Sequence, residues 1–344
     1  MAAFGAPPYF AQAVLAAASI KAQHPNLPIA IVSDQPGHPL LQPGWFDHKL
    51  PMDLSGAPAL PHGFAAPLLG RVSALALSPF QKTLSFDVDA RLRAPRLDAL
   101  FALLDQVEIA MAPCFPDTSR ERQMFGRPIY NNGIILYRKT ERMLTFLRRF
   151  EDTFRRHLAA ATAAMPDVAA VAHIPGGADR QRLLCSDQIA LAQFFSPERN
   201  DTGAIFAVLG DHWNWRGGDA TRRPAEPIVI DHHPSLRENT WPQLADLAFR
   251  LLAAGDGKRA APLYGQVLAA LQPDLFDASR ETLMAQLQHA PETAAAADRI
   301  AGLAPAPPNL ESLLRIAALH AVPLRQADRA ARILAKVAPA QPGR

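Results

Sequence analysis

The chain has 344 residues, of which 49% are hydrophobic and 19% are charged, and its net charge is +3 with a pI near 9.0. This length is enough for one large domain and a smaller one. No lysine or arginine run is long enough to predict a nucleic-acid-binding tract, so we expect no nucleic-acid partner. The two cysteines, Cys114 and Cys185, exclude a disulfide framework and a cysteine-rich zinc site.

Apolar strand-like runs alternate with helical patterns through the first half of the chain. After a very short opening strand, the expected strands are Ile29–Val32, Thr83–Phe86, Val107–Ala112 and Gly133–Tyr137, and the expected helices cover about 8–21, 66–77, 95–105, 140–160 and 186–195. Such alternation predicts an α/β domain with a mostly parallel sheet flanked by helices. In sheets of this kind, ligands bind beyond the carboxyl ends of the strands.

No apolar run approaches the roughly 20 residues that a membrane-spanning helix needs. The alanine-rich stretch Ala11–Ile20 could pass for a signal-peptide core, but the first lysine, Lys21, follows it instead of preceding it. We therefore interpret the stretch as the first crossover helix and expect a cytoplasmic protein. Association with the inner face of a membrane through a partner stays open.

Two carboxylates, Asp87 and Asp89, follow the expected strand that ends at Phe86. Residues i and i+2 of a strand point to the same side, so both carboxylates can reach one cation. Hard divalent cations prefer oxygen ligands and often keep substrate phosphates in their remaining positions. The pair therefore predicts a cation site for a nucleoside-diphosphate ligand, whereas a solvated turn is the alternative.

Seven further motifs accompany this pair along the first 240 residues. They are Gly5-Ala-Pro-Pro-Tyr9, His24-Pro-Asn-Leu-Pro28 with a strand ending at Asp34, Gly70-Arg71 before Ser78-Pro79-Phe80, Asn131-Asn132-Gly133, Cys185-Ser-Asp187-Gln188, Asp211-His-Trp-Asn214-Trp215, and His232-His233 before Trp241. In this order they resemble nucleotide-diphospho-sugar transferases of the GT-A fold, in particular glycosyltransferase family eight. The chain departs from the family at Ala90-Arg91, where a small or hydroxylated residue is usual, and it lacks the closing Lys-Pro-Trp.

The resemblance implies a GT-A, Rossmann-like fold over residues 1–240. It implies an enzyme that moves a hexose from a nucleotide-diphosphate sugar, with UDP as the nucleotide, to an acceptor hydroxyl, and retention of anomeric configuration. The implied cofactor is Mn²⁺ or Mg²⁺, which would neutralise the leaving diphosphate. A glycan, a lipid-linked molecule or a protein would each fit as the acceptor, and surface glycan synthesis is the implied setting.

The resemblance also implies roles for individual residues. Asp87, Asp89 and His232 would hold the metal, with His233 as the competitor of His232. Asp187 and Gln188 would be the catalytic pair near the reacting carbon, and Ser186 could cap their helix and leave Asp187 free. The residues implied to contact donor or nucleotide are Gly5, Tyr9, Asp34, Arg71, Asp87, Asn132 and Gly133.

After Trp241 the chain becomes rich in Ala, Leu, Arg, Gln and Pro with helical spacing. Pro273, Pro308 and Pro342 are about 34 residues apart, a period typical of paired-helix repeats. We interpret residues 241–344 as three degenerate tetratricopeptide-like repeats that could recruit a protein partner. A generic helical subdomain is the alternative.

Two other functions compete with the transferase. In a haloacid-dehalogenase-type phosphatase, Asp87 would attack phosphorus and Asp89 would act as general acid, although that family has Gly-Thr where this chain has Ala90-Arg91. In a non-catalytic scaffold, the transferase domain would have decayed and the helical repeats would bind partners. The intact Asp pair and the Asp187-Gln188 motif argue against decay.

Overall fold

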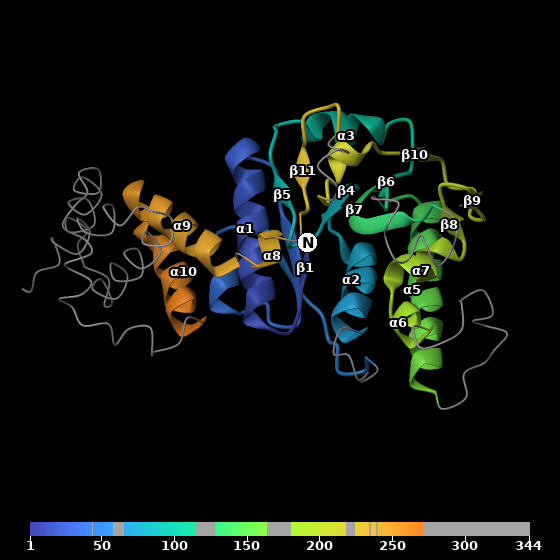
Figure 1. Cartoon of the computed structure of the whole chain (residues 1–344), viewed down its shortest axis with the longest axis horizontal. Helices are drawn as coiled ribbons and strands as arrows, with labels where there is room; N and C mark the ends of the chain where they lie inside the picture. Colours follow the sequence, from blue (N-terminus) through green and yellow to red (C-terminus); the bar gives the residue numbers. More distant parts are fainter. Residues whose placement is uncertain are drawn as a thin grey trace, which may run out of the picture. The chain divides into compact units, whose positions relative to one another are not determined.

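The computed structural model describes residues 1–42, 44–57, 65–114, 128–163, 180–217, 224–233, 235–238 and 240–270 (Figure 1). The chain divides into two units. The first comprises Met1–Pro36 and Trp45–Arg237, and the second comprises Gly37–Gly44 with the described chain from Glu238 onward. The predicted division between residues 240 and 241 did not include Gly37–Gly44 in the second unit.

One sheet of the first unit has three parallel strands in the order β1 (Ala2–Ala3), β2 (Ala30–Ser33) and β3 (His48–Pro51). The predicted second strand is therefore present and parallel to its neighbours. The short opening strand is β1, and β3 was not predicted, because its burial is partial and its sequence contains a histidine, a lysine and a proline.

The other main sheet has four strands in the order β10 (Phe206–Val208), β6 (Ile109–Pro113), β7 (Tyr130–Arg138) and β4 (Lys82–Phe86). The one parallel pairing in this sheet is β10 with β6, because β7 runs antiparallel to both β6 and β4; β10, β6 and β4 therefore point the same way. Three of the four strands of this sheet thus share one direction, as expected for a mostly parallel sheet, and the reversal of β7 makes the sheet mixed. Strand spacing predicts that strands exist, but it does not reveal that one of them is reversed.

Two small antiparallel pairs complete the described strands. β5 (Arg91–Leu92) pairs with β11 (Ile230–Asp231), and β8 (Phe195–Ser196) pairs with β9 (Arg199–Asn200). The first pair joins the residues just after the Asp pair to those just before the two histidines. It therefore positions the candidate site.

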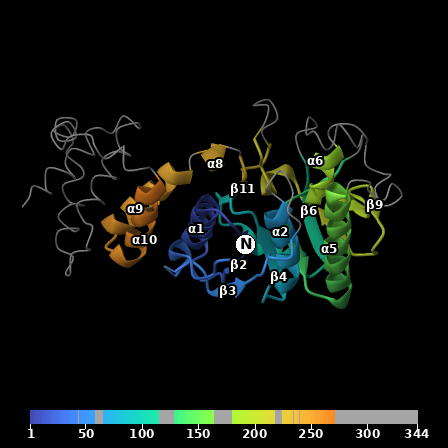
Figure 2. The ribbon, with the colours of Figure 1, turned by 90° about the horizontal axis from the view of Figure 1, so that it is seen from below.

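The predicted helices of the first unit are all present with shifted ends. They are α1 (Pro7–Gln23), α2 (Ala65–Leu77), α3 (Leu97–Leu103), α5 (Glu141–Thr162) and α7 (Asp187–Ala192); the short helices α6 (Arg180–Leu184), η2 (Asp211–Trp213) and α8 (Ser235–Glu238) were not predicted. In Figure 2, α2 and α5 lie side by side against the four-stranded sheet, and contacts link both to α7.

The main core lies between this sheet and these helices. Its fully buried members include Tyr137 of β7 and Phe150 and Phe154 of α5. Aromatic side chains dominate the burial of apolar area in such a layer. Phe195 stacks on Tyr130 with ring centroids 5.1 Å apart, so the chain around α7 is anchored to the start of β7.

The second unit contains η1 (Pro39–Leu41), α9 (Thr240–Ala253) and α10 (Gly257–Ala270). α9 and α10 contact each other along their lengths and are joined by a turn in which Gly255 has φ +83°, a left-handed conformation suited to glycine. This pair covers the first predicted repeat. The two later repeats, with Pro273, Pro308 and Pro342, lie outside the described residues.

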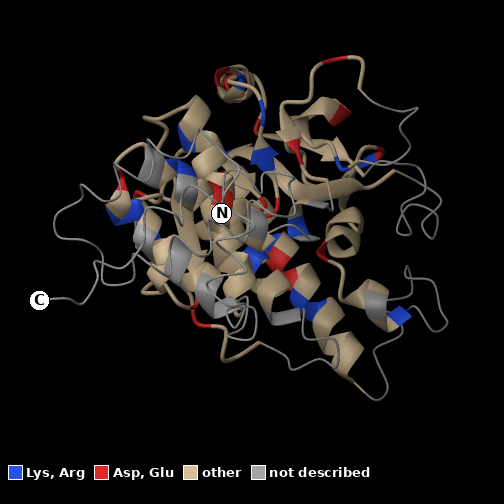
Figure 3. Cartoon of the chain, turned by 60° about the vertical axis from the view of Figure 1, so that its left-hand side comes forward, with Lys and Arg blue, Asp and Glu red and all other residues tan. Residues whose placement is uncertain are grey.

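Basic and acidic residues are interspersed along the described ribbon (Figure 3). Several arginines of α5 are engaged locally, as Arg155 is with Glu151 at 2.6 Å and Arg149 with Asp201 at 3.7 Å. None of the described helices combines the length and apolar character required to cross a membrane.

Thr140 caps α5 and ties it to the sheet. Its Oγ1 accepts a hydrogen bond from the Met143 backbone N–H at 3.1 Å and donates to Glu108 Oε1 at 2.8 Å. We expect Thr140→Ala to lower the free energy of unfolding by about 1–2 kcal/mol, because the helix loses its cap and buried Glu108 loses a donor. Urea denaturation would measure this. Thr140→Ser keeps the hydroxyl and should retain most of the wild-type stability. Thr145→Ala, on the exposed face, should have little effect. Equal losses of stability in Thr140→Ala and Thr145→Ala would contradict the capping role.

Candidate functional site

The Asp pair lies directly beyond the carboxyl end of β4. The Asp87 backbone N–H donates to the Gly133 carbonyl at 2.9 Å, which extends the contact between β4 and β7 by one step. The chain then turns, with the Ala90 N–H bonded to the Asp87 carbonyl at 3.1 Å. Asp89 is only 4% exposed, so the alternative of a solvated turn does not describe it.

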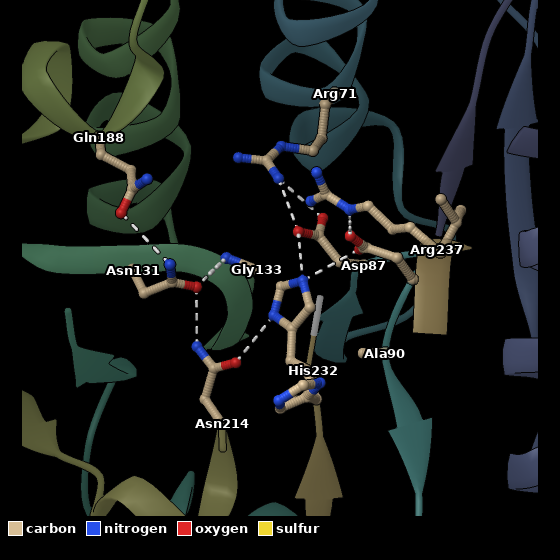
Figure 4. Close-up of polar contacts among 12 residues, drawn as sticks. Arg71, Asp87, Ala90, Asn131, Gly133, Gln188, Asn214, His232 and Arg237 are labelled. Atoms are coloured by element: carbon tan, nitrogen blue, oxygen red, sulfur yellow. Dashed lines mark hydrogen bonds and ion pairs between the residues drawn. The ribbon is translucent and has the colours of Figure 1, made fainter. Parts of the chain in front are cut away.

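His232 completes a cluster with the two carboxylates. Its Nε2 lies 3.0 Å from Asp89 Oδ1 and 3.6 Å from Asp87 Oδ2, and the residue is 3% exposed (Figure 4). One ligand atom from each of the three residues lies within 4.8 Å of the others. His233 is exposed, and its ring lies against Gly217. Of the two histidines, therefore, the structure brings His232 to the carboxylates.

Backbone pairing holds His232 in place. Its N–H donates to the Trp215 carbonyl at 2.6 Å, and the Trp215 N–H donates to the Ile230 carbonyl at 2.9 Å. Ile230 in turn pairs with Leu92, three residues after Asp89. Three chain segments that are distant in sequence therefore meet at the cluster.

Two arginines neutralise the carboxylates. Arg71 Nη1, from α2, donates to both oxygens of Asp87 at 2.8 Å, and its Nη2 pairs with Asp187 at the start of α7. Arg237 Nε, from α8, pairs with Asp89 Oδ2. Figure 4 shows both arginines pointing into the cluster.

The pKa shifts follow from burial and these pairs. Burial raises the pKa of Asp87, and the nearby Asp89 charge raises it further, against the opposing effect of Arg71. Burial also favours a higher pKa for Asp89, but the hydrogen bond and charge of His232, together with Arg237, outweigh it and lower this pKa. For Arg71, burial is outweighed by Asp187 and Asp87, so its pKa is raised.

A second group of polar side chains adjoins His232. Asn131 Oδ1 accepts hydrogen bonds from the Gly133 N–H and from Asn214 Nδ2, each at 2.8 Å, and Asn131 Nδ2 donates to Gln188 Oε1 at 3.3 Å. Asn214 Oδ1 lies 3.0 Å from His232 Nδ1. These residues connect the cluster of Asp87, Asp89 and His232 to Gln188, the predicted catalytic residue.

The sequence prediction chose Asn132 from the Asn-Asn pair, but Asn131 is the one that lies in this group. Neighbouring residues of a strand face opposite sides, so a shift of one position decides which asparagine reaches Gln188. Asn132 is 2% exposed, and neither polar atom of its amide has a hydrogen-bond partner among the described residues.

Asp187 is not left free by a capping Ser186. Ser186 does occupy the N-cap position of α7, but its side chain makes no capping hydrogen bond. Asp187 Oδ1 accepts from the Gln188 N–H at 2.9 Å while its other oxygen pairs with Arg71. Asp187 therefore orders the helix start and joins the cluster at once.

The predicted nucleotide-binding residues of the opening motif lie at the ends of β1 and β2. The Gly5 N–H lies 3.0 and 3.2 Å from the two carboxylate oxygens of Asp34, and Gly5 has φ +80°. Tyr9 lies in the first turn of α1 and is partly buried. Gly5 and Asp34 are thus brought together.

Sequence reasoning missed Arg237 and the burial of Arg91. Arg91 is 5% exposed, its Nη1 donates to two backbone carbonyls, and burial lowers its pKa to about 10. Neither arginine belongs to a motif. The only available signal was the unusual residue after Ala90.

A largely apolar cavity of about 280 Å³ lies beside the cluster, lined by residues of β1, β2, α2 and β4. Arg71 lines it as well. The other polar residues of the cluster are not among its described lining residues, so the cavity adjoins the cluster only at Arg71.

No protein-family model matches this sequence, and no match is found among curated proteins. Solved structures that it resembles are glycosyltransferases. They include galactosyltransferase LgtC in complex with donor and acceptor sugar analogues (14% identity, TM-score 0.44, covering 68% of this chain and 86% of that one). Mouse xyloside xylosyltransferase 1 has 15% identity and TM-score 0.42, covering 68% and 96%. GlyE of Streptococcus pneumoniae TIGR4 has 18% identity and TM-score 0.42, covering 70% and 59%. Similarity at this level assigns no function by itself.

Gly133 is required by the close approach of His232. A Cβ added at this position would lie 2.4 Å from His232 Cε1 and 2.8 Å from Asn131 Oδ1. We expect Gly133→Ala to lower the free energy of unfolding by about 1–3 kcal/mol, because the imidazole must move away from Asp89. Gly56→Ala, where a Cβ meets nothing within 4 Å, is the matched control. Equal stability of the two variants in urea denaturation would show that His232 does not hold this position.

Proposed function

We propose that this chain is a cation-dependent glycosyltransferase that uses a nucleotide-diphosphate sugar, with a UDP-sugar as the first candidate. The observation that carries the proposal is the convergence of Asp87, Asp89 and His232 at the end of β4. The ordered motifs of the first 240 residues, which resemble family eight of the GT-A transferases, supply the reaction class.

The three residues fit a divalent cation such as Mn²⁺ or Mg²⁺. Carboxylate oxygens suit both ions, and one imidazole nitrogen is compatible with Mn²⁺. Both carboxylates are mostly buried and are matched by arginines in the structure, so the site already places positive charge against them. When bound, the cation would neutralise the diphosphate that leaves the sugar.

The chain's own residues would orient the donor and hold its charges. Transfer breaks the bond between the anomeric carbon and the diphosphate oxygen and forms a bond from that carbon to the acceptor oxygen. The acceptor proton passes to the departing diphosphate if configuration is retained, as the family resemblance suggests. Arg71 would hold Asp187 in place, and Gln188 would face the sugar from the start of α7.

The remaining roles extend the same proposal. Gly5, Tyr9 and Asp34 would contact the nucleotide, and Gly133 would let the donor approach the backbone. Asn132 is proposed as a donor contact on the basis of the family motif. The helical second unit would choose or position a glycan, lipid-linked or protein acceptor.

The phosphatase alternative gains no support from the contacts of Asp87. A nucleophilic carboxylate must reach a phosphorus atom with a free oxygen, whereas both oxygens of Asp87 accept from Arg71. Asp89 is bound by His232 and Arg237 instead of being placed as a free general acid.

The decisive measurement is calorimetric binding of UDP with and without Mn²⁺. We expect Mn²⁺-dependent binding in the wild type and its loss in Asp89→Asn, because the amide cannot supply the same negative ligand. Asp98→Asn removes an exposed carboxylate in α3 and should bind like the wild type. Absence of binding to both UDP and GDP would contradict the proposal, and hydrolysis of a UDP-sugar would extend it.

In the structure, Arg237 Nε pairs with Asp89 Oδ2, an atom that the proposed cation would use. Its side chain is 58% exposed, so the pair is worth only about 0.2–1 kcal/mol and can be displaced. We expect Arg237→Met to tighten binding of Mn²⁺ alone by up to about fivefold, because the ion no longer competes with the guanidinium. Electron paramagnetic resonance of free Mn²⁺ measures this. Arg155→Met is the control, and weaker binding in Arg237→Met would show that the arginine supports the ion instead.

A further inference from the structure

We propose that Asn214 and Asn131 are positioning residues that set the tautomer of His232, so that its Nε2 faces the cation. This inference rests on the proposed cation site. Neither asparagine touches the carboxylates. Both act through a series of hydrogen bonds. The series starts at the Gly133 backbone N–H, which can only donate.

The chain starts at the Gly133 N–H. A backbone N–H can only donate, so the atom of Asn131 that lies 2.8 Å from it must be the carbonyl oxygen Oδ1. The same oxygen lies 2.8 Å from Asn214. Because Oδ1 can only accept, Asn214 must present its Nδ2 amide there.

That orientation leaves Asn214 Oδ1 facing His232. An amide oxygen can only accept, so His232 Nδ1, at 3.0 Å, must carry a hydrogen. The other ring nitrogen, Nε2, then faces Asp89 and Asp87. In a neutral imidazole with a hydrogen on Nδ1, Nε2 holds the lone pair, which is the form a metal ion binds.

The opposite tautomer would be expected without this chain. A hydrogen on Nε2 could donate to Asp89 Oδ1 at 3.0 Å, so the carboxylate on its own favours Nε2–H. Asn214 holds a hydrogen on Nδ1 from the other side of the ring, so in the metal-free protein both nitrogens can donate, and a cation at Nε2 displaces only the hydrogen that faces Asp89. Partners of this kind set the orientation and basicity of metal-bound histidines, and losing one typically weakens metal binding about 10–100-fold.

The tautomer can be read directly by long-range ¹H–¹⁵N NMR of the metal-free protein, with His232→Gln used to assign the signal. We expect Nδ1 to carry a hydrogen in the wild type and to lose it in Asn214→Leu, where Nε2–H takes over. Asn131→Asp keeps an oxygen for the Gly133 N–H and for Asn214, so it should keep the wild-type tautomer. Asn131→Leu removes that oxygen, so it should give a mixture.

Titration with Mn²⁺ alone provides the second readout. We expect Asn214→Leu to bind Mn²⁺ about 10–100-fold more weakly than the wild type. Asn200→Leu is the matched control, because Asn200 bonds only local groups such as the Ala204 carbonyl among its described contacts. Thermal melting of each variant separates a loss of metal binding from a loss of fold.

The outcomes separate the two proposals. If the wild type binds Mn²⁺ but Asn214→Leu keeps both the tautomer and the affinity, the positioning role is overturned while the cation site stands. If the wild type does not bind Mn²⁺, the proposed function fails, and the asparagines lose their role as positioning residues for a metal ligand. A tautomer change together with weaker Mn²⁺ binding in a folded Asn214→Leu variant supports both.

Discussion

Burial of three carboxylates around one point is the constraint on which the candidate site depends. Asp87, Asp89 and Asp187 each expose 14% or less of their side chains. A buried carboxylate costs several kcal/mol unless it is paired and hydrogen-bonded. The partners come from α2, from the segment after β11 and from α8, at sequence separations of 16 to 148 residues. Charge pairing therefore links these segments, and between α2 and α7 it adds to the apolar packing of the main core.

The two arginines meet this constraint in different ways. Arg71 is mostly buried, contacts two carboxylates and links α2 to α7, so its removal would leave two negative charges without their cation. Arg237 is exposed over more than half of its side chain and contacts one carboxylate. The site thus has one permanent and one displaceable positive charge. The proposed cation would replace the second without disturbing the helices that the first connects.

Much of this arrangement could be predicted from the sequence, because its strongest signals are local. The apolar run before Asp87 predicted β4, and the amphipathic pattern of α5 predicted a long helix. What could not be predicted depends on direction or on remote pairing. The reversal of β7, the contact of Asn131 with Gln188, and Arg237 on a four-residue helix leave no periodic trace in the chain.

The choice between His232 and His233 also depends on pairing with a remote segment of the chain. The sequence places two identical side chains at the end of one short strand, and alternation makes only one of them face inward. Which one depends on the pairing of β11 with β5, since this pairing sets the face of Asp231 and hence of its neighbour. The sequence pattern identifies both histidines as candidates. Which of them faces the carboxylates is decided by the pairing register of β11 with β5.

Hydrogen-bond direction carries this reasoning one step further. In a network of side-chain amides and a histidine, every group can be turned around, so geometry alone leaves two consistent assignments. A hydrogen bond from one backbone N–H selects a single assignment, because a backbone N–H can donate but cannot accept. Here that contact is made by Gly133, the residue whose missing Cβ also makes room for His232. One glycine therefore supplies both the space for the imidazole and the reference that orients it.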